Sequence, residues 1–200
     1  MKNIKRILLS IIVIAAVWSS FYTENLTEKK QREMMTQNNP EQWVATFMQD
    51  SLITLKDRAV TLCELAEGIA TGHKEFAERH GRTLGIGSPV FYVVQGNCEA
   101  PQLINGEELQ GTAEGVPFSI PLKYIFGNTA RDASGWFNID DFLNTMDFNA
   151  VSAALNNYIA ARLKAFQWTP LQPIEFTGAV AIPADAQKLD QATIITYQLQ

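Results

Sequence analysis

The chain has 200 residues, of which 46% are hydrophobic and 18% are charged, a balance typical of a globular protein with one domain and short appendages. Its formal net charge is −5, and an acidic surface repels phosphate backbones, which argues against nucleic-acid binding. Two cysteines without C-x-x-C spacing and two histidines are too few for the usual zinc clusters. We therefore expect no metal site and no cofactor.

The N-terminus has the layout of an export signal, with three basic residues before an apolar run over residues 7–22. At about 1.5 Å per residue this run spans roughly 24 Å, short of the roughly 30 Å hydrocarbon core. Trp18 and Tyr22 can extend its reach as interfacial anchors. No cysteine follows for lipid attachment, and a cleavage site with small residues is poor. We predict that residues 1–23 form an uncleaved, single-pass anchor in the inner membrane, with the remainder in the periplasm; the alternative is a cleaved signal that releases the chain there.

The next segments are a polar tether and a helical region. Residues 24–39 are polar and of mixed charge, and Asn39-Pro40 then suits the start of a helix. Apolar residues recur at helical spacing over residues 43–69. This pattern predicts an amphipathic helix within residues 40–83 and allows for one break in it. His73 and His80 lie in a polar run at its end, where we expect solvated side chains.

From Pro89 the spacing of the apolar residues changes: they no longer recur at helical spacing but at every second position, as in a strand. Strands are predicted over residues 89–97, more weakly 102–112, and most clearly 117–126; a helix over 148–166 and two further strands follow, with a bulge at Gly178. Three strands, one helix and two strands is the element order of an OB-type barrel. The prediction is an α+β fold in which an N-terminal amphipathic helix packs on a small OB-like Greek-key β-barrel, residues 84–200, with one long helix between strands 3 and 4.

Cys63 and Cys98 allow two interpretations. Outside the cytoplasm they can form a disulfide. Cys63 also falls on the apolar stripe of the predicted helix, where a free cysteine packs as a small hydrophobic residue. The sequence leaves both open.

The unusual polar residues of the chain concentrate over residues 127–156, between the clearest strand and the long helix. The candidate ligand-binding residues are Asn128, Arg131, Asp132, Trp136, Asn144 and Asn156. Amide, guanidinium and carboxylate groups side by side can fix a polyhydroxyl or carboxylate ligand, and an adjacent tryptophan offers a stacking surface.

A structural interpretation competes with the binding one. Asn138 with Asp141, and Asp147, suit helix caps, and Arg131 can pair with Asp132. Capping explains Asn144 and Asn156 least well. We expect a buried, structural Asp132 and a partly exposed Arg131, which is therefore the better ligand candidate.

These segments resemble a bacterial family of predicted periplasmic lipoproteins whose function is unknown. The likeness rests mainly on Gly127 with Arg131-Asp132-Ala133, on Asp141-Phe142-x-Asn144, and on Ala154-Leu155-Asn156. Pro40, Gly81-Arg82, the strand FYVVQG ending at Gly96, and Phe176-Thr177-Gly178 extend it over almost everything after Asn39. The resemblance implies an OB-like fold outside the cytoplasm, association with sugar ABC-transporter loci, and no established catalytic residue. The family's lipidated cysteine is absent here, so anchoring falls to the apolar segment.

These observations favour a membrane-tethered periplasmic binding or accessory module that is not an enzyme and that assists a sugar-type ABC uptake system. Its expected partners are the inner membrane, contacted through the N-terminal segment, and ABC-transporter components or a small polar solute. The alternative is a structural or protein-interaction component of the envelope with no small-molecule ligand.

Overall fold

The computed structural model describes residues 40–123, 127–142, 144–170 and 172–200. The predicted anchor (1–23), the tether (24–39) and the cap residue Asn39 lie outside these ranges. Within them, no helix is both long and apolar enough to cross a membrane.

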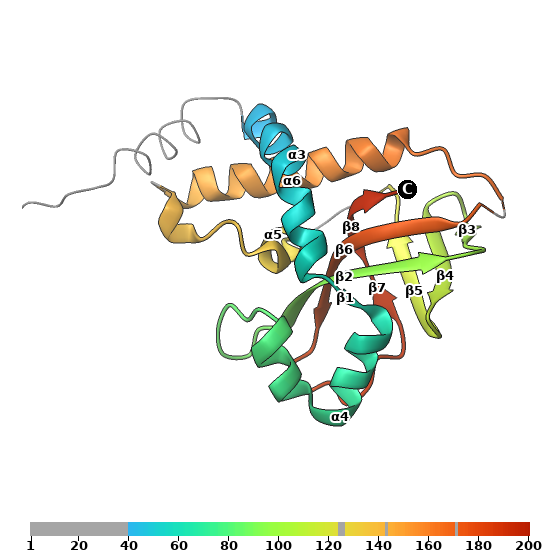
Figure 1. Ribbon diagram of the computed structural model, residues 1–200. Coiled ribbons are helices and arrows are strands. Elements are labelled where there is room, and N and C mark those ends of the chain that lie inside the picture. Colours follow the sequence, from blue (N-terminus) through green and yellow to red (C-terminus); the bar gives the residue numbers. More distant parts are fainter. Residues whose placement is uncertain (1–39, 124–126, 143, 171) are drawn as a thin grey trace, which may run out of the picture.

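The strands form two four-stranded sheets (Figure 1). The first sheet has the order β1-β2-β6-β8, with β1 (Val60–Thr61), β2 (Val90–Cys98), β6 (Ile174–Ile182) and β8 (Ile195–Leu199). The second has the order β3-β4-β5-β7, with β3 (Gln102–Ile104), β4 (Glu108–Ala113), β5 (Val116–Pro121) and β7 (Ala192–Thr193). Because β7 and β8 are separated by a single residue, the end of the chain joins the two sheets.

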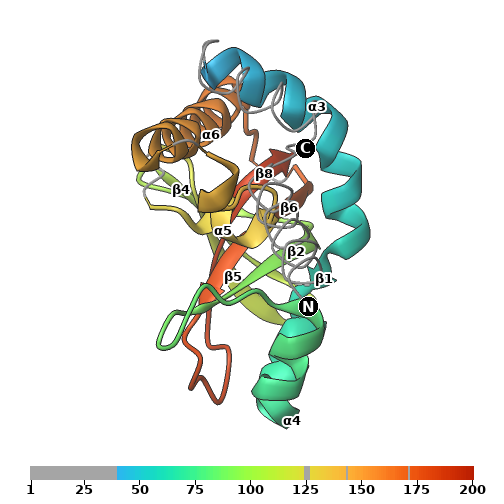
Figure 2. The same ribbon diagram turned by 90° about the vertical axis from the view of Figure 1, so that its left-hand side faces the viewer.

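Helices cover the first sheet on the face away from the second sheet. They are α3 (Pro40–Arg58), α5 (Thr129–Ser134) and α6 (Thr145–Ala165), with a 3-10 turn at Ile139–Asp141 before α6. In Figure 1 α3 crosses α6, and the two helices are in contact. In Figure 2 α3 runs along one side of the molecule and α4 (Leu62–His80) continues from its lower end.

Both faces of the first sheet are buried, and this explains the long apolar run of β2. Val90, Tyr92 and Val94 belong to the core shared with α4 and the second sheet, where Phe118 and Phe176 join the sheets with ring centroids 4.9 Å apart. The residues between them, Phe91 and Val93, belong instead to the core under α3, α5 and α6. A strand covered on both sides is apolar at successive positions rather than alternating with polar ones.

The predicted α+β class is confirmed, but the strand count is higher than expected. The weak strand over 102–112 is the β3–β4 hairpin, which turns at Asn105 and Gly106, both with positive φ. The clearest strand is β5, which ends at Pro121 rather than continuing to residue 126; residues 124–126 lie outside the described ranges. The long helix therefore lies between β5 and β6. Among the described strands no pairing joins the two sheets, so no closed barrel is found.

The helical region of residues 40–83 contains a strand. Residues Val60 and Thr61 separate α3 from α4 and pair in parallel with Val94 and Gln95 of β2. Thr61 then caps α4: its hydroxyl accepts from Glu64 N at 3.1 Å, and the Glu64 carboxylate accepts from Thr61 N at 2.8 Å. A strand of two residues is too short to show an alternating pattern in the sequence. The sequence could therefore indicate only a break in the helix at this point.

The expectation of a solvated His73 is wrong, whereas His80 is exposed as predicted. His73 is 8% exposed and its Nε2 lies 3.0 Å from the hydroxyl of Tyr92. A kink at Gly72 interrupts α4 just before it, which changes the direction of the following turn. Burial raises the pKa of Tyr92 to about 12. Cys63 is half-buried and Cys98 buried, and both are free thiols.

The bulge predicted at Gly178 is confirmed, and it provides a test of the fold. The β6–β8 register shifts between Thr177 and Gly178, and a Cβ at Gly178 would lie 2.4 Å from Ile194 Cγ2 and 2.9 Å from the Ile195 carbonyl oxygen. We expect Gly178→Ala to lower the free energy of unfolding by about 1–3 kcal/mol, because the chain must shift to admit a methyl group.

Urea unfolding of the full chain measures this change. Gly85→Ala is the control, since a Cβ there meets nothing within 4 Å, and its effect should stay within about 0.5 kcal/mol. Equal stabilities of the two variants would contradict the close packing of β6 against β8.

Candidate functional site

The polar junction after β5 is organised by a buried ion pair between neighbouring residues of α5. Arg131 is 6% and Asp132 7% exposed. Arg131 Nε and Nη2 lie 2.7 and 2.6 Å from Asp132 Oδ1. Arg131 Nη1 also donates to Ser152 Oγ at 2.9 Å, and its guanidinium carbon lies 4.2 Å from the centroid of the Phe148 ring. Ser152 and Phe148 belong to α6, so the pair connects the short helix to the long one.

Further hydrogen bonds, donated by residues of β8 and α3, hold α5 in place. The Tyr197 hydroxyl of β8 donates to the Ala130 carbonyl at 2.5 Å, and burial raises the pKa of this tyrosine. Arg58, the last residue of α3, donates to the Ser134 carbonyl at 2.6 Å. A helix of six residues is too short to be stable by itself, so these contacts from outside hold it in place.

The expected partial exposure of Arg131 is wrong, because its side chain is enclosed by α6 and paired inside the protein. Asp132 is buried as predicted. Mutual pairing, the structural alternative for these two residues, is what the structure contains.

Of the other four candidate residues, Asn156 lies next to Asn128, because it bonds the carbonyl of the adjoining Gly127, whereas Asn144 and Trp136 make separate contacts. Asn144 is the N-cap of α6: its Oδ1 accepts from Asp147 N at 2.9 Å, which corrects the expectation that capping explains it poorly. Asn156 Nδ2 donates to the Gly127 carbonyl at 2.9 Å. Asn128 is exposed, and Trp136 is half-buried, its ring centroid 5.0 Å from that of Phe47 in a T-shaped contact.

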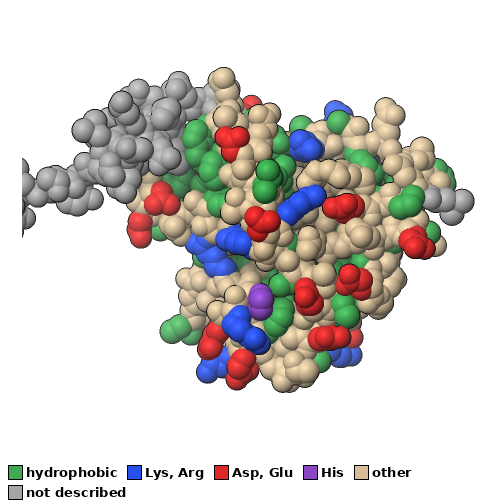
Figure 3. All heavy atoms as spheres, viewed as in Figure 1, with side chains coloured by type: hydrophobic (Ala, Val, Ile, Leu, Met, Phe, Trp, Pro, Cys, Tyr) green, Lys and Arg blue, Asp and Glu red, His purple; other side chains and the backbone are tan. Residues whose placement is uncertain are grey.

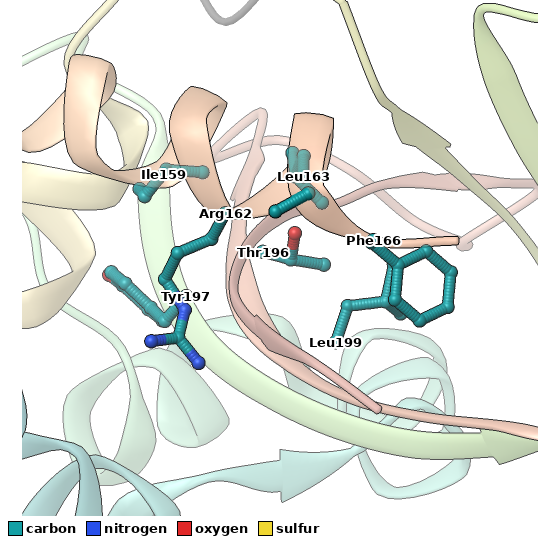
Figure 4. Close-up of a pocket in the computed structure, with 8 residues that line it drawn as sticks. Ile159, Arg162, Leu163, Phe166, Thr196, Tyr197 and Leu199 are labelled. Atoms are coloured by element: carbon teal, nitrogen blue, oxygen red, sulfur yellow. The ribbon is translucent and has the colours of Figure 1, made fainter. Parts of the chain in front are cut away.

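A pocket that the sequence did not indicate lies between α6 and β8 (Figure 4). This α6–β8 pocket has a volume of about 290 Å³ and is lined by Ile159, Arg162, Leu163, Ala165, Phe166, Thr196, Tyr197 and Leu199. The hydroxyl of Thr196 points toward α6, and it is buried without a hydrogen-bond partner among the described residues. Arg162 lies beside it on an exposed turn of α6 and also contacts Tyr158. No local pattern marks Thr196 as a pocket residue, because it is a single buried threonine in a largely apolar strand.

A second opening, here called the basic cleft, lies where α3, α4 and β2 meet. It has a volume of about 470 Å³ and is lined by Asp57, Arg58, Ala59, Val60, Glu64, Arg79, His80, Gly81, Arg82, Phe91, Val93 and Ala133. Arg82 follows α4 and is fixed by two backbone hydrogen bonds with Phe91, of 2.9 and 2.8 Å. Figure 3 shows Lys and Arg side chains on this face, near α5 and the ends of α3 and α4, with Asp and Glu side chains between them.

The α6–β8 pocket, the basic cleft and two further pockets, one beside Cys98 and one beside Trp168, contain none of the six predicted residues. Within the described ranges, no group of three or more His, Cys, Asp or Glu side chains could hold a metal ion. Both openings present hydrogen-bonding and charged side chains.

Comparison with known proteins gives a family and a fold. The family model described as "Predicted periplasmic lipoprotein (DUF2291)" matches residues 11–200. A crystal structure of an OB-fold protein from Thermotoga maritima is similar, with a TM-score of 0.67 and 17% sequence identity over 82% of this chain and 98% of that one. At that identity the likeness shows the fold alone. No curated protein matches the chain.

The buried pair predicts a large cost for removing either partner. We expect Arg131→Ala and Asp132→Ala each to lower the free energy of unfolding by about 3–5 kcal/mol, because each leaves the other charge buried without its partner. Chemical denaturation measures both. Asn128→Ala, at an exposed neighbouring position, should change stability by no more than about 0.5 kcal/mol. A stable Arg131→Ala variant would contradict a structural role for this side chain.

Proposed function

Because this chain belongs to the family of predicted periplasmic lipoproteins, we propose that it is a membrane-tethered, non-catalytic binding module that assists a sugar-type ABC uptake system in the periplasm. The observation that carries the proposal is the unpartnered Thr196 hydroxyl in the α6–β8 pocket. A buried hydroxyl without a partner costs about 1–3 kcal/mol, a cost that a ligand with its own hydroxyl groups would remove.

The rest of the pocket suits a small polar solute with an apolar face. Phe166 and Leu199 offer apolar walls, and the Arg162 guanidinium at the rim offers several donors and no acceptor. A sugar carries both kinds of surface, with hydroxyl groups around its edge and C–H groups on its faces. At about 290 Å³ the pocket is at the small end of ligand sites, which favours a single sugar ring over a longer chain.

The lining also supports binding without catalysis. It contains no Asp, Glu, His or Cys, the side chains most often used as general acids, bases or nucleophiles. Tyr197 lines the pocket, but its hydroxyl is committed to the Ala130 carbonyl. A solute in this pocket would be held and released unchanged.

The alternative function, a structural or interaction component of the envelope, is favoured by a different observation. The residues that carry the resemblance to the family, Arg131, Asp132, Asn144 and Asn156, make internal contacts and caps. A family motif used only for folding is what a protein without a small-molecule ligand would contain. Genes for a permease and an ATPase beside this gene would favour uptake, and their absence would favour the alternative.

Direct titration with monosaccharides tests the binding proposal. We expect at least one aldose to bind, and Thr196→Val to weaken its binding about tenfold, since one hydrogen bond contributes about 1.4 kcal/mol. The variant should fold at least as stably as the parent, because valine keeps the shape and removes the unpartnered hydroxyl. Thr112→Val, on an exposed position of β4, is the matched control and should bind normally. Unchanged affinity in Thr196→Val, or no binding by the parent to any monosaccharide tested, would refute the pocket as a sugar site.

The proposed tether predicts how the chain fractionates. Because the apolar run of residues 7–22 lacks both a good cleavage site and a lipidated cysteine, the full-length chain should sediment with membranes. It should be released by detergent and retained in high salt, since an apolar anchor is not screened by ions. A shortened chain in the soluble periplasmic fraction would contradict the tether.

A further inference from the structure

The basic cleft brings together arginines from separate parts of the chain, a site independent of the α6–β8 pocket. Arg58 ends α3, Arg79 lies in the last turn of α4, and Arg82 follows α4 on a backbone bridge to β2. All three line the same opening of about 470 Å³, whose inner wall includes the buried side chains of Phe91 and Val93. Three guanidinium groups on one opening place positive charge on a protein that is acidic as a whole.

Two of these guanidinium groups meet over the glycine that ends α5. Gly135 has φ of 68°, and a Cβ built on it would lie 2.6 Å from Arg82 Nη1 and 3.7 Å from Arg58 Nη1. The Nη1 atoms of both arginines therefore lie within 4 Å of the same point beside Gly135. Each is held by a neutral acceptor: Arg58 donates to the Ser134 carbonyl and Arg82 to Asn138 Oδ1, both at 2.6 Å.

The positive charge in the cleft is not neutralised by ion pairs. Within the described part of the chain, none of the three arginines forms a salt bridge with a carboxylate. Two acidic residues, Asp57 and Glu64, also line the opening, so three arginines against two carboxylates leave it a formal charge of +1 with His80 neutral. Among the described residues neither carboxylate forms an ion pair with these arginines. Like charges held close together repel each other, so the arrangement is more stable when an anion lies between them.

We propose that the basic cleft binds a phosphate group. A guanidinium presents a planar fork of donors, and one fork is enough to hold the two oxygens of a carboxylate. Two forks that converge from different directions instead match a group whose oxygens point in several directions and whose charge exceeds one. Free phosphate or a phosphomonoester provides both properties, whereas the phosphodiester of a lipid headgroup offers only two terminal oxygens and a single charge.

Calorimetric titration of the full chain in a non-ionic detergent, at constant ionic strength set by potassium chloride, tests this proposal. One arm uses inorganic phosphate, and the other uses glycerophosphoglycerol, the water-soluble headgroup of a phospholipid. We expect saturable binding of phosphate at one site, and binding at least tenfold weaker in Arg82→Gln. Arg82→Lys keeps the charge but loses the fork, and should bind several-fold more weakly than the parent. Lys188→Gln, which removes an exposed positive charge paired with Asp190, should bind normally.

The outcomes separate the sources and the two proposals. Stronger binding of inorganic phosphate assigns a soluble phosphate, and stronger binding of glycerophosphoglycerol assigns a lipid headgroup. Absence of saturable binding in both arms, or equal affinity in the parent, Arg82→Gln and Arg82→Lys, would overturn the site. Thr196 does not line the cleft, so Thr196→Val should bind phosphate normally whether or not the α6–β8 pocket takes a sugar.

Discussion

The ion pair between Arg131 and Asp132 is the interaction on which the arrangement of the helices depends. Burying two charges is costly, and the cost is met here by a short ion pair, by the Ser152 hydroxyl and by the face of the Phe148 ring. Because these partners come from α6, the pair fixes the short α5 against the long helix. Tyr197 and Arg58 attach the same short helix to the sheet and to α3. A segment of six residues thus joins three other elements, α3, α6 and β8.

Local features of the fold were predictable, because they depend on neighbouring residues. The change of period at Pro89, the bulge at Gly178 and the capping pair of Asn138 with Asp141 are all signals of this kind, and each corresponds to a feature of the structure. Features set by distant partners were not predictable. The strand at Val60 exists because β2 lies beside it, and Arg131 is buried because α6 covers it. The residues next to an arginine in the sequence do not reveal whether its side chain will be buried or exposed.

The same distinction applies to the candidate site. The polar residues over 127–156 are conspicuous in the sequence because capping and ion pairing need particular residue types at short spacing. The two openings instead combine ordinary residues from distant elements, such as Arg162 with Thr196, or Arg58 with Arg82. No short motif marks such a combination. The structure therefore separates the part of the sequence that holds the domain together from the surfaces on which a solute or a phosphate group could bind.

The central claim is that Arg131 and Asp132 act as one structural unit, and a double-mutant cycle tests it most directly. The variants are Arg131→Met, Asp132→Leu and the combination of both, compared by their free energies of unfolding. If the pair is a unit, the double variant should be more stable than the two single losses added together predict, by about 1–3 kcal/mol, because it leaves no buried charge unpaired. If the double variant loses as much free energy of unfolding as the two single variants together, the two residues act independently. That result would contradict the account and return Arg131 to the group of candidate ligand-binding residues.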